Sequence, residues 1–302
     1  MKSVIVIMST YNGSSNVCRQ LDSIFRQKGV EISVVIRDDN SKDDTVEVLK
    51  KYAKATGKKI KVITGINEGY AKSFWDALRM SGEADYYAFS DQDDVWKDDK
   101  LIKSITPIEE SAFVGPKLAY CRMQRSDKKL NRLDEQVRVL RPTQLSKKIC
   151  LTQTYNYGAA TIFNGEAREL ICRCWPDRGD VPHDLWAGLL CYWFGEVFYV
   201  DEELYYWIRY ESSVTGEGTK KSGKLYRLKE SLRKKSYPNV AKYILDYYSE
   251  LVLDADRSFL NDILNYKDES RSKSRLLFDK EFRRSNLSGT FILKMGILLN
   301  WY

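Results

Sequence analysis

The sequence is poor in the side chains that build structural zinc sites. It has a single histidine in 302 residues, and its six cysteines are scattered without a CxxC pair. A structural zinc ion needs four cysteine or histidine ligands, so we expect no such site. Scattered cysteines, in a chain without a leader segment before its first apolar run, predict free thiols in a reducing cytoplasm.

Long apolar runs and glycine-rich nucleotide motifs are absent too. No uninterrupted apolar stretch approaches the roughly 18 to 20 residues of a membrane-spanning helix, so we expect no spanning segment. The pattern G-x-G-x-x-G does not follow the first apolar run, where residues 9–16 read STYNGSSN. This absence disfavours a dinucleotide-dependent oxidoreductase.

Positive charge is concentrated in the last part of the chain. Residues 219–302 contain 18 basic and 10 acidic residues, whereas residues 1–218 contain 31 and 32. This distribution predicts a nearly neutral body with a basic helical extension that favours an anionic partner. The extension suits either an anionic membrane surface or a helical bundle packed on the body or on a second copy. No RNA- or DNA-binding module is recognisable, so we expect no nucleic acid partner.

In the first third of the sequence, apolar runs typical of buried strands alternate with stretches that have helical periodicity. Apolar, β-branched runs predict buried strands, and they cover residues 3–9, 31–39, 59–65 and 85–91. Stretches with apolar residues at helical spacing lie between them, at residues 17–27, 45–56 and 70–81. This order predicts an α/β fold with a doubly wound, mostly parallel sheet, whose ligands bind at the carboxyl ends of the strands.

The pattern is weaker after residue 105. Further strands are expected at 118–124, 158–163, 196–202 and 204–210, with an apolar helix from His183 and an irregular, charged stretch at 125–150. We therefore predict a first domain over residues 1–216, which the change in pattern divides into a half at about 1–105 and a half at about 106–216. The basic helical region would cover residues 217–302.

Carboxylates follow the fourth predicted strand. The segment AFSDQDDVWKDDK, residues 88–100, places five aspartates within nine positions, although the chain has a net charge of +7. A second acidic pair, Asp38 and Asp39, ends the second strand. Crowded carboxylates at one edge of a sheet are typical of a divalent cation site, and Mg²⁺ and Mn²⁺ prefer such oxygen ligands. Asp91 and Asp93 form the D-x-D pattern that would bind this cation.

Five ordered motifs resemble one known family. VIVIMSTYNG, VVIRDDNSKDDT, NEGYAKSF, FSDQDDVWKDDKL and HDLW stand in the order found in the inverting family-2 glycosyltransferases, which have the GT-A fold. DQDDVW…DKL followed by His-Asp is most similar to the bacterial rhamnosyltransferase-like branch, which builds surface polysaccharides. The resemblance covers roughly residues 1–216, and it implies a GT-A catalytic domain there, with a nucleotide-sugar half at about 1–105 and an acceptor half at about 106–216.

The resemblance implies roles for the residues that match its motifs. Asp93 would bind Mg²⁺ or Mn²⁺ directly, with Asp91 steering ribose or a metal-bound water. Asp39 would accept the N3–H of a uracil or thymine, which implies a UDP- or dTDP-sugar. The remaining residues expected around the nucleotide-sugar are Thr10, Tyr11, Asn12, Asn67, Gly69, Lys72, Gln92 and Arg209. Tyr210 stands where relatives often have a histidine, so Arg209 or Tyr210 is expected at the diphosphate.

The His-Asp motif implies the catalytic group. Asp184 would remove the proton from an acceptor hydroxyl, and His183 would orient Asp184 or contact the acceptor. Trp186, Tyr157 and Gly158 are candidates for the acceptor side, although a core position is the default interpretation of Trp186.

These observations favour a metal-dependent, inverting glycosyltransferase. It would move rhamnose or another hexose from a dTDP- or UDP-sugar to a growing, lipid-linked polysaccharide, at the inner face of the plasma membrane. Two alternatives stay open: a Mg²⁺-dependent phosphotransferase or phosphatase that uses Asp91 and Asp93, and a catalytically silent scaffold of a polysaccharide assembly complex. Association of two copies through the C-terminal helices is a further possibility that the basic extension leaves open.

Overall fold

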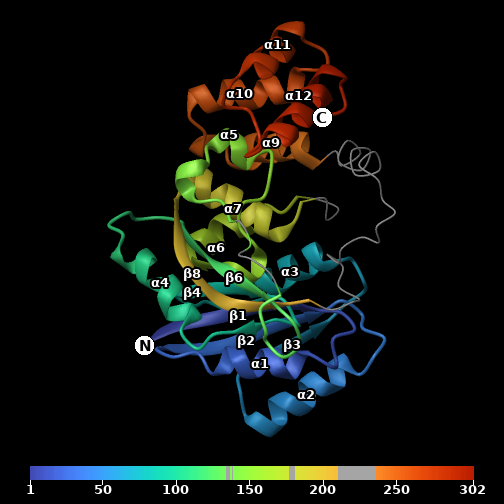
Figure 1. Cartoon of the computed structure of the whole chain (residues 1–302), viewed down its shortest axis with the longest axis vertical. Helices are drawn as coiled ribbons and strands as arrows, with labels where there is room; N and C mark the ends of the chain where they lie inside the picture. The colour runs from blue at the N-terminus through green and yellow to red at the C-terminus, as the bar shows by residue number, and fades with distance from the viewer. Residues whose placement is uncertain (134–136, 138, 177–180, 210–235) are drawn as a thin grey trace. The chain divides into compact units, whose positions relative to one another are not determined.

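The computed structural model describes residues 1–133, 137, 139–176, 181–209 and 236–302 (Figure 1). The chain divides into two compact units. The first unit comprises Met1–Leu140 and Tyr155–Glu211, and the second comprises Arg141–Thr154 and Ser212–Tyr302. The short segment 141–154, which the sequence pattern suggested as part of an irregular loop, is therefore grouped with the C-terminal helices.

Four parallel strands form one half of the sheet in the first unit. They are β1 (Lys2–Thr10), β2 (Val30–Asp38), β3 (Ile60–Thr64) and β4 (Tyr86–Ser90), in the spatial order β3-β2-β1-β4. Thr10 pairs with Asp38, and Asp38 pairs with Thr64, so the carboxyl ends of three strands are level. The predicted α/β sheet and its four strands are thereby confirmed.

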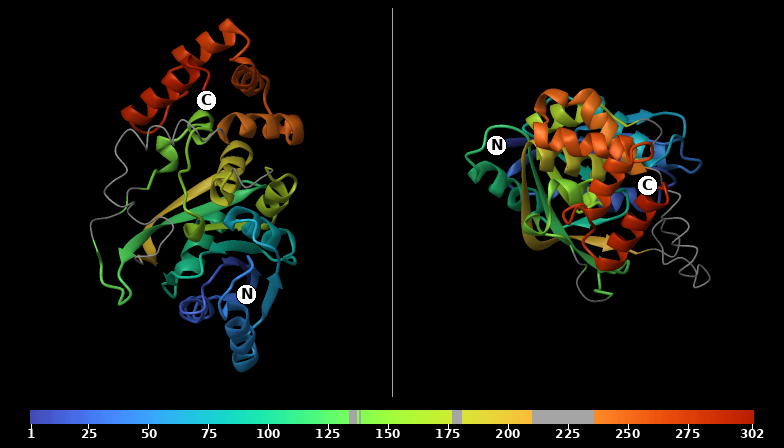
Figure 2. Two further views of the ribbon diagram at one scale, coloured as in Figure 1. Left: turned by 90° about the vertical axis from the view of Figure 1, so that its right-hand side faces the viewer. Right: turned by 90° about the horizontal axis from the view of Figure 1, so that it is seen from above.

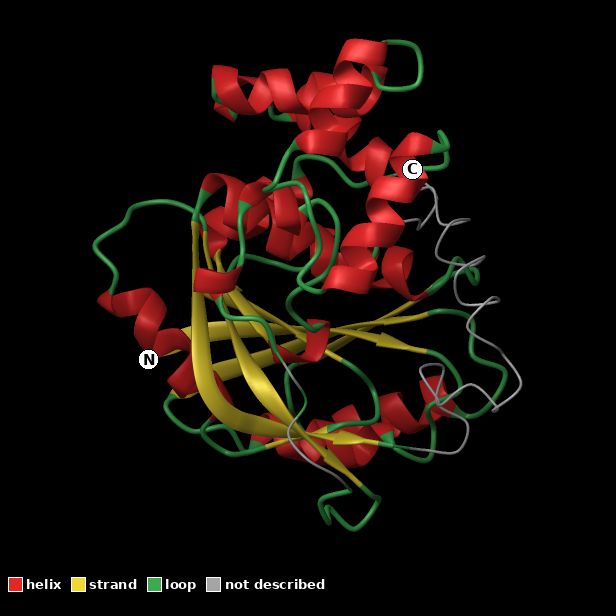
Figure 3. Cartoon of the chain, turned by 45° about the horizontal axis from the view of Figure 1, so that its top comes forward, coloured by secondary structure: helices red, strands yellow, loops and turns green. Residues whose placement is uncertain are grey.

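Helices cover both faces of this parallel half (Figure 3). The connections contain α1 (Val17–Phe25), α2 (Thr45–Thr56) and α3 (Tyr70–Arg79). Because the chain moves outward from β1 to β3 and then returns past β1 to β4, right-handed crossovers place α1 and α2 on one face and α3 on the other. Val6 and Ile7 of β1 are completely buried between these layers.

The other half of the sheet is mixed. β7 (Thr161–Asn164) pairs antiparallel with β4, β6 (Lys117–Ser126) pairs antiparallel with β7, and β8 (Glu196–Ile208) pairs parallel with β6. The two-residue β5 (Val95–Trp96) closes this edge beside β8. The prediction of two strands between residues 196 and 210 was wrong, because β8 is one strand of 13 residues that absorbs an irregular register opposite Cys121–Met123.

The described part of the first unit also contains the α-helices α4 (Lys100–Glu110), α6 (Gly165–Cys172) and α7 (His183–Phe194). Helix α7 is the predicted apolar helix. Nine of its 12 residues are buried, including Trp186 and Leu190. Its first residues are the His-Asp motif, so the packing of α7 against the sheet determines where this motif lies.

The second unit is helical and is coloured orange to red, with the green α5, in Figure 2. It contains α5 (Lys147–Cys150), α9 (Ser236–Tyr247), α10 (Asp254–Asn265), α11 (Ser270–Phe278) and α12 (Leu287–Leu298). Ion pairs join the 141–154 segment to the helices, because Lys147 contacts Asp256 at 2.6 Å and Lys148 contacts Asp279 at 2.7 Å. In the part of the chain that the structure describes, no helix is long and apolar enough to cross a bilayer.

Candidate active site

The ends of β1 and β2 are fastened to each other by their own polar side chains. The Thr10 hydroxyl donates to Asp38 at 2.9 Å, and the Asp39 N–H donates to the Thr10 carbonyl at 2.8 Å. Asp38 also accepts hydrogen bonds from the N–H and hydroxyl of Ser41. Thr10 is only 1% exposed. Its side chain therefore lies beneath the predicted nucleotide pocket and supports it, and it does not face a ligand.

The loop after β1 is held between two other loops. The Gln92 side chain accepts a hydrogen bond from the Tyr11 N–H at 2.9 Å and donates to the Tyr11 carbonyl at 3.1 Å. Asn12, with φ of 49°, accepts from the Lys42 N–H at 2.8 Å. The Tyr11 ring remains 46% exposed and free to cover a base or ribose. Gln92 thus joins the D-x-D loop to the loop that was predicted to hold the nucleotide.

Asp39 belongs to a buried ion network that the sequence analysis missed. Its carboxylate accepts hydrogen bonds from the Arg37 guanidinium and from the N–H groups of Glu68 and Gly69, the latter two at 2.9 Å. The Asn67 amide donates to the Asp39 carbonyl at 2.9 Å. Arg37 is 3% exposed in the middle of this network. Asp39 therefore fixes the loop after β3, and its contact with a pyrimidine stays a prediction.

The same network also contains Lys72. Its ammonium contacts Asp76 at 2.5 Å, and Asp76 lies 3.6 Å from Arg37. In this arrangement the Lys72 ammonium is paired with Asp76 of the same helix, and it is not directed at a phosphate. The signal for Arg37 was present in the sequence, since an arginine beside two aspartates in a buried strand has to be paired.

The aspartates after β4 lie at the carboxyl edge of the sheet and differ in their surroundings. Burial, and then the neighbouring charges of Asp93 and Asp184, raise the pKa of Asp91. Burial raises the pKa of Asp93, while the positive charges of Arg19 and Arg209 act in the opposite direction. Asp91 and Asp184 are 93 positions apart in the sequence, yet the fold brings their charges within interaction range.

Asp94 supports the D-x-D loop from inside. It is 1% exposed, and one carboxylate oxygen accepts a hydrogen bond from the Ile208 N–H at 3.2 Å. Lys100, which is fully buried, lies nearby with its ammonium 3.7 Å from the centre of the Trp96 ring. This cation offsets part of the Asp94 charge. Asp94 thus ties the end of β4 to the end of β8, directly before Arg209.

The donor atoms at this edge suit a divalent cation. Within the described ranges, neither Asp91 nor Asp94 forms an ion pair, and the buried carboxylates raise the pKa values of one another. An added cation would relieve this repulsion, and oxygen donors are those that Mg²⁺ and Mn²⁺ prefer. No described group of three or more acidic, histidine or cysteine side chains forms a complete metal site. Asp91 and Asp93 would therefore share the cation with oxygen atoms of a ligand.

His183 and Asp184 occupy the first turn of α7. Asp184 accepts hydrogen bonds from the N–H groups of Leu185, at 2.8 Å, and Gly158. Burial nevertheless raises the pKa of Asp184 to about 6. A carboxylate with this pKa is a stronger base than an ordinary aspartate and is still largely ionised at neutral pH. These properties suit the general base predicted at this position.

The environment of His183 is apolar. Its ring stacks on Phe74 with centroids 3.8 Å apart and meets the edge of Phe89 at 4.7 Å. Burial lowers the pKa of His183 to about 3, so the imidazole is neutral near pH 7. Of the two roles expected for His183, its packing suits support of the helix turn that carries Asp184. Contact with an acceptor stays a prediction.

The candidates for the acceptor side differ in exposure. Trp186 is completely buried and donates from its indole nitrogen to the Cys174 carbonyl at 2.9 Å, so it belongs to the core and cannot stack on a sugar. Tyr157 is 39% exposed, and the Asp184 charge contributes to raising its pKa after burial. Gly158 lies against the His183 ring. Of the three predicted residues, Tyr157 is the one that faces outward beside Asp184.

Trp207, which the sequence analysis did not predict, lies beside Tyr157 and adds a second aromatic ring to this side of the site. Its ring lies 6.3 Å from that of Tyr157, and the guanidinium of Arg209 lies over it at 4.5 Å. Arg209 also exerts its charge on Asp93. This position suits the predicted contact with a diphosphate. Tyr210, the other residue considered for that contact, lies outside the described residues.

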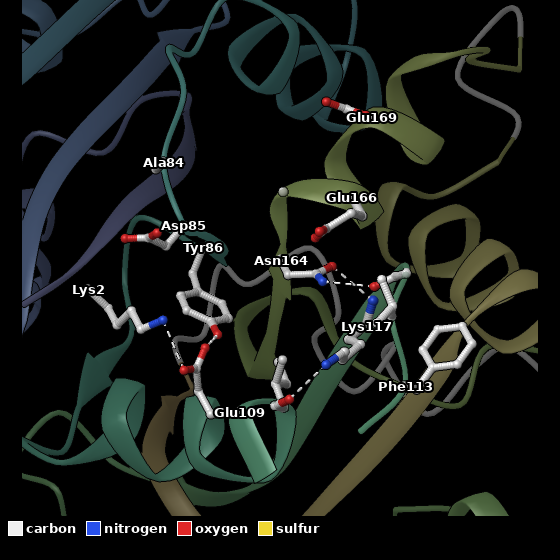
Figure 4. Close-up of a pocket in the computed structure, with 14 residues that line it drawn as sticks. Lys2, Ala84, Asp85, Tyr86, Glu109, Phe113, Lys117, Asn164, Glu166 and Glu169 are labelled. Carbon is white, nitrogen blue, oxygen red and sulfur yellow. Dashed lines mark hydrogen bonds and ion pairs between the residues drawn. The ribbon is translucent and has the colours of Figure 1, made fainter. Parts of the chain in front are cut away.

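A hollow of about 540 Å³ lies at the opposite, amino-terminal ends of the strands (Figure 4). Several of its polar groups are already engaged in hydrogen bonds and an ion pair. Glu109 contacts the ammonium of Lys2 at 2.9 Å and accepts a hydrogen bond from the Tyr86 hydroxyl, while the Lys117 ammonium donates to the Ile108 carbonyl at 3.1 Å. None of the predicted site residues lines this hollow, so it is separate from the candidate active site.

Comparisons with known sequences give matches to one family of proteins. Residues 5–168 match the sequence profile of the family described as Glycosyl transferase family 2. The chain is 36% identical over 102 residues to a dTDP-rhamnosyl transferase, RfbG, of Shigella flexneri, which covers 32% of this chain and 35% of that protein. It is 33% identical over 102 residues to a putative teichuronic acid biosynthesis glycosyltransferase, TuaG, of Bacillus subtilis, covering 34% and 40%. The matched stretch thus spans roughly a third of these relatives.

Solved structures show the same fold. TarS residues 1–349 of S. aureus, in complex with UDP-GlcNAc, superpose over 100% of this chain and 80% of that chain, with a TM-score of 0.61 and 18% identity. A mannosyltransferase, PcManGT of Pyrobaculum calidifontis, in complex with GDP-Man and Mn²⁺, covers 100% and 81%, with a TM-score of 0.54 and 16% identity. The predicted GT-A architecture is confirmed by these likenesses.

Proposed function

The chain belongs to glycosyl transferase family 2, and from this premise we propose that it is a metal-dependent, inverting glycosyltransferase. It transfers rhamnose or another hexose from a dTDP- or UDP-sugar to a lipid-linked acceptor of a bacterial surface polysaccharide. The observation that carries the proposal is the convergence at Asp91, where the charges of Asp93 and Asp184 both act, although Asp184 lies 93 positions further along the chain. This convergence supports a donor site with a base beside it.

The donor lies across the carboxyl ends of β1, β2 and β4. Tyr11 covers the nucleoside, the network of Asp39 and Asn67 shapes the pocket for a pyrimidine, and Arg209 attracts the diphosphate. Asp91 and Asp93 hold Mg²⁺ or Mn²⁺, which when bound supplies positive charge for the departing diphosphate. The nucleotide-sugars named for the two structural neighbours and the rhamnosyl transferase among the relatives support this class of donor.

Asp184 acts on the acceptor. Its carboxylate takes the proton of an acceptor hydroxyl while that oxygen forms a bond to the anomeric carbon, and the bond from this carbon to the diphosphate oxygen breaks. A single displacement of this kind inverts the anomeric configuration and needs no covalent intermediate. His183 remains neutral throughout and holds the first turn of α7, while Tyr157 and Trp207 offer aromatic surfaces to the acceptor sugar.

The proposed location of the protein in the cell follows from the lipid linkage of the acceptor. A lipid-linked acceptor is bound to a membrane, and an enzyme that uses a cytoplasmic nucleotide-sugar would meet it at the inner face of the plasma membrane. We therefore propose a peripheral enzyme at that face. A phosphatase would not require Asp184 beside the aromatic rings of Tyr157 and Trp207. A catalytically silent scaffold would not require crowded carboxylates that destabilise one another.

The test is donor binding followed by transfer. We expect Mn²⁺ together with dTDP-rhamnose or a UDP-hexose to raise the melting temperature, and Asp93→Asn to remove this shift. Asp184→Asn should keep the shift and lose transfer by about 10²-fold or more. Asp201→Asn, at an exposed carboxylate paired with Arg122, is the matched control and should retain both. Unchanged transfer by Asp184→Asn would refute the base, and absence of any nucleotide-induced shift would refute the donor site.

A further inference from the structure

Helix α12 is apolar around its whole circumference. It comprises 12 residues, LSGTFILKMGIL, with one charged side chain among them. Leu293, Gly296 and Ile297 are buried against the rest of the second unit. A helix that only covers a core needs one apolar face and is polar on the other. The outward face of α12 is apolar as well, and the packing of the second unit does not explain it.

The outward face forms a continuous stripe. Leu287, Phe291 and Leu298 are 91%, 67% and 50% exposed, and the spacings of four and seven residues place them on one side of the helix. Trp301, directly beyond the helix, is 51% exposed. Phe278, at the end of α11, is 83% exposed. We call these five residues the α12 face.

Phe278 lies close to this stripe because α11 and α12 run side by side. The Lys294 ammonium of α12 donates to the Leu276 and Asp279 carbonyls, the second at 2.9 Å. The residues that carry these carbonyls flank Phe278 on both sides in the sequence. The end of α11, which carries the exposed Phe278, therefore lies beside the middle of α12.

The chain around this face is basic. Residues 280–302 contain Lys280, Arg283, Arg284 and Lys294 but only one acidic residue, Glu281. Glu281 is itself 3.2 Å from Lys148. Lys280 and Arg283 are exposed beside the start of α12. An apolar stripe bordered by cations, with a tryptophan at its end, matches the chemistry of an anionic lipid surface: acyl chains for the stripe, phosphates for the cations.

We propose that the α12 face binds an anionic lipid bilayer, with α12 lying in the plane of the interface. A helix of 12 residues is too short to cross the hydrocarbon core, so an interfacial orientation is the one that buries its outer face. Anionic lipid would also neutralise Lys280 and Arg283, which an apolar contact between two copies of the chain does not provide for.

This inference deepens the proposed function and rests on it for its purpose. A catalytic unit whose acceptor is attached to a lipid gains a higher local concentration of that acceptor when it is bound to the same bilayer. Binding to the bilayer itself needs neither donor nor acceptor. Vesicle binding can therefore succeed or fail independently of catalysis.

The experiment is cosedimentation of the full chain with vesicles. We expect binding to phosphatidylcholine vesicles that contain phosphatidylglycerol, weak binding to phosphatidylcholine alone, and loss of binding at high salt. Leu287→Ser/Phe291→Ser should lower the affinity for anionic vesicles about tenfold or more. Val114→Ser/Leu133→Ser, which changes two exposed apolar side chains of the first unit, should leave it unchanged.

Charge variants separate the two contributions. Lys280→Glu/Arg283→Glu should also lower the affinity about tenfold or more and reduce its salt dependence. Lys50→Glu/Lys54→Glu, on exposed lysines of α2, changes the net charge equally and should have little effect. Circular dichroism shows whether each variant is folded, and the nucleotide-induced melting shift without vesicles reports separately on the donor site.

Three results would overturn the proposal. The first is wild-type protein that does not sediment with anionic vesicles, and the second is a folded Leu287→Ser/Phe291→Ser variant that sediments as well as the wild type. The third is a wild-type dimer that this variant converts to a monomer while vesicle binding stays the same. In that case the α12 face is a contact between copies of the chain.

Discussion

Nε2 of His183 lies 2.3 Å from the position that a Cβ atom on residue 158 would occupy. The imidazole therefore packs directly on the α-carbon of Gly158, and the N–H of the same glycine donates to the carboxylate of Asp184. Gly158 thus contacts two consecutive residues of α7: His183 packs on its α-carbon, and Asp184 accepts from its N–H. These two contacts hold the proposed base, Asp184, next to the aromatic rings of Tyr157 and Trp207.

Gly158→Ala should displace the His-Asp motif. The added methyl group would overlap the His183 ring, which Phe74 holds from the other side at 3.8 Å. We expect a loss of about 1–3 kcal/mol in the free energy of unfolding, as for overpacked cores, and a fall in kcat greater than the change in KM. Gly82→Ala is the control, since no atom lies within 4 Å of its Cβ position. Wild-type kcat in Gly158→Ala would contradict the close packing.

His183→Phe should retain transfer within about threefold, because a neutral ring that packs on Phe74 and Phe89 needs no titrating nitrogen. A large loss of kcat in a folded His183→Phe variant would show instead that the imidazole touches a substrate. His183→Ala is the companion variant. It should lose stability by creating a cavity, by about 2–4 kcal/mol, and kcat should fall with it.

The same substitution should reduce the sensitivity of the fold to acid. The pKa of His183 is about 3 in the folded chain and about 6.5 when unfolded. Between these values the unfolded state binds the extra proton, so stability is lost as the pH falls below about 6.5. From pH 6.5 to 5, His183 contributes a loss of about 2 kcal/mol that His183→Phe should lack. Denaturant unfolding at both pH values measures this, and an identical loss in the variant would contradict the buried, neutral ring.

The rate should depend on the ionisation of Asp184. Its pKa is raised to about 6 by burial, and the base is active only when deprotonated. We expect kcat/KM, which reports on the free enzyme, to fall below about pH 6. A cation bound beside Asp91 lowers the pKa of a nearby carboxylate, so the acid limb of kcat should lie at lower pH than that of kcat/KM. Limbs that coincide, or a limb on the alkaline side only, would argue against Asp184 as the base.

Gln92→Ala should weaken donor binding more than it slows transfer. The Gln92 amide joins the D-x-D loop to Tyr11 through two hydrogen bonds, and their loss is expected to cost about 1–2 kcal/mol, or roughly tenfold in the dissociation constant of the nucleotide. Calorimetric titration with dTDP or UDP and Mn²⁺ measures this change. Gln144→Ala removes a similar side chain-to-backbone bond in the second unit and should leave nucleotide affinity unchanged.

The strand–helix alternation of the first hundred residues could be predicted because it is local. The run from Ser3 to Ser9 is apolar and β-branched, and the structure places it in β1 between two covered faces. The likeness of the motifs to family 2 is confirmed by the profile match. The prediction of Asp91 and Asp93 at this edge was possible because strands of a parallel sheet end at one edge, whereas Asp184 was predicted from the resemblance of its motif to the family. Their individual roles stay predictions.

The sequence by itself determined which residue types stand at the ends of the strands, since hydrophobic periodicity and turn chemistry are properties of neighbouring residues. Only the tertiary structure decided their surroundings. It buried Trp186 and made His183 neutral, it engaged Asp39 with the N–H groups of Glu68 and Gly69, and it brought Trp207 beside Tyr157. These outcomes depend on contacts between residues far apart in the chain, and burial and pairing, which set the pKa and the accessibility of a side chain, exist only once those contacts have formed.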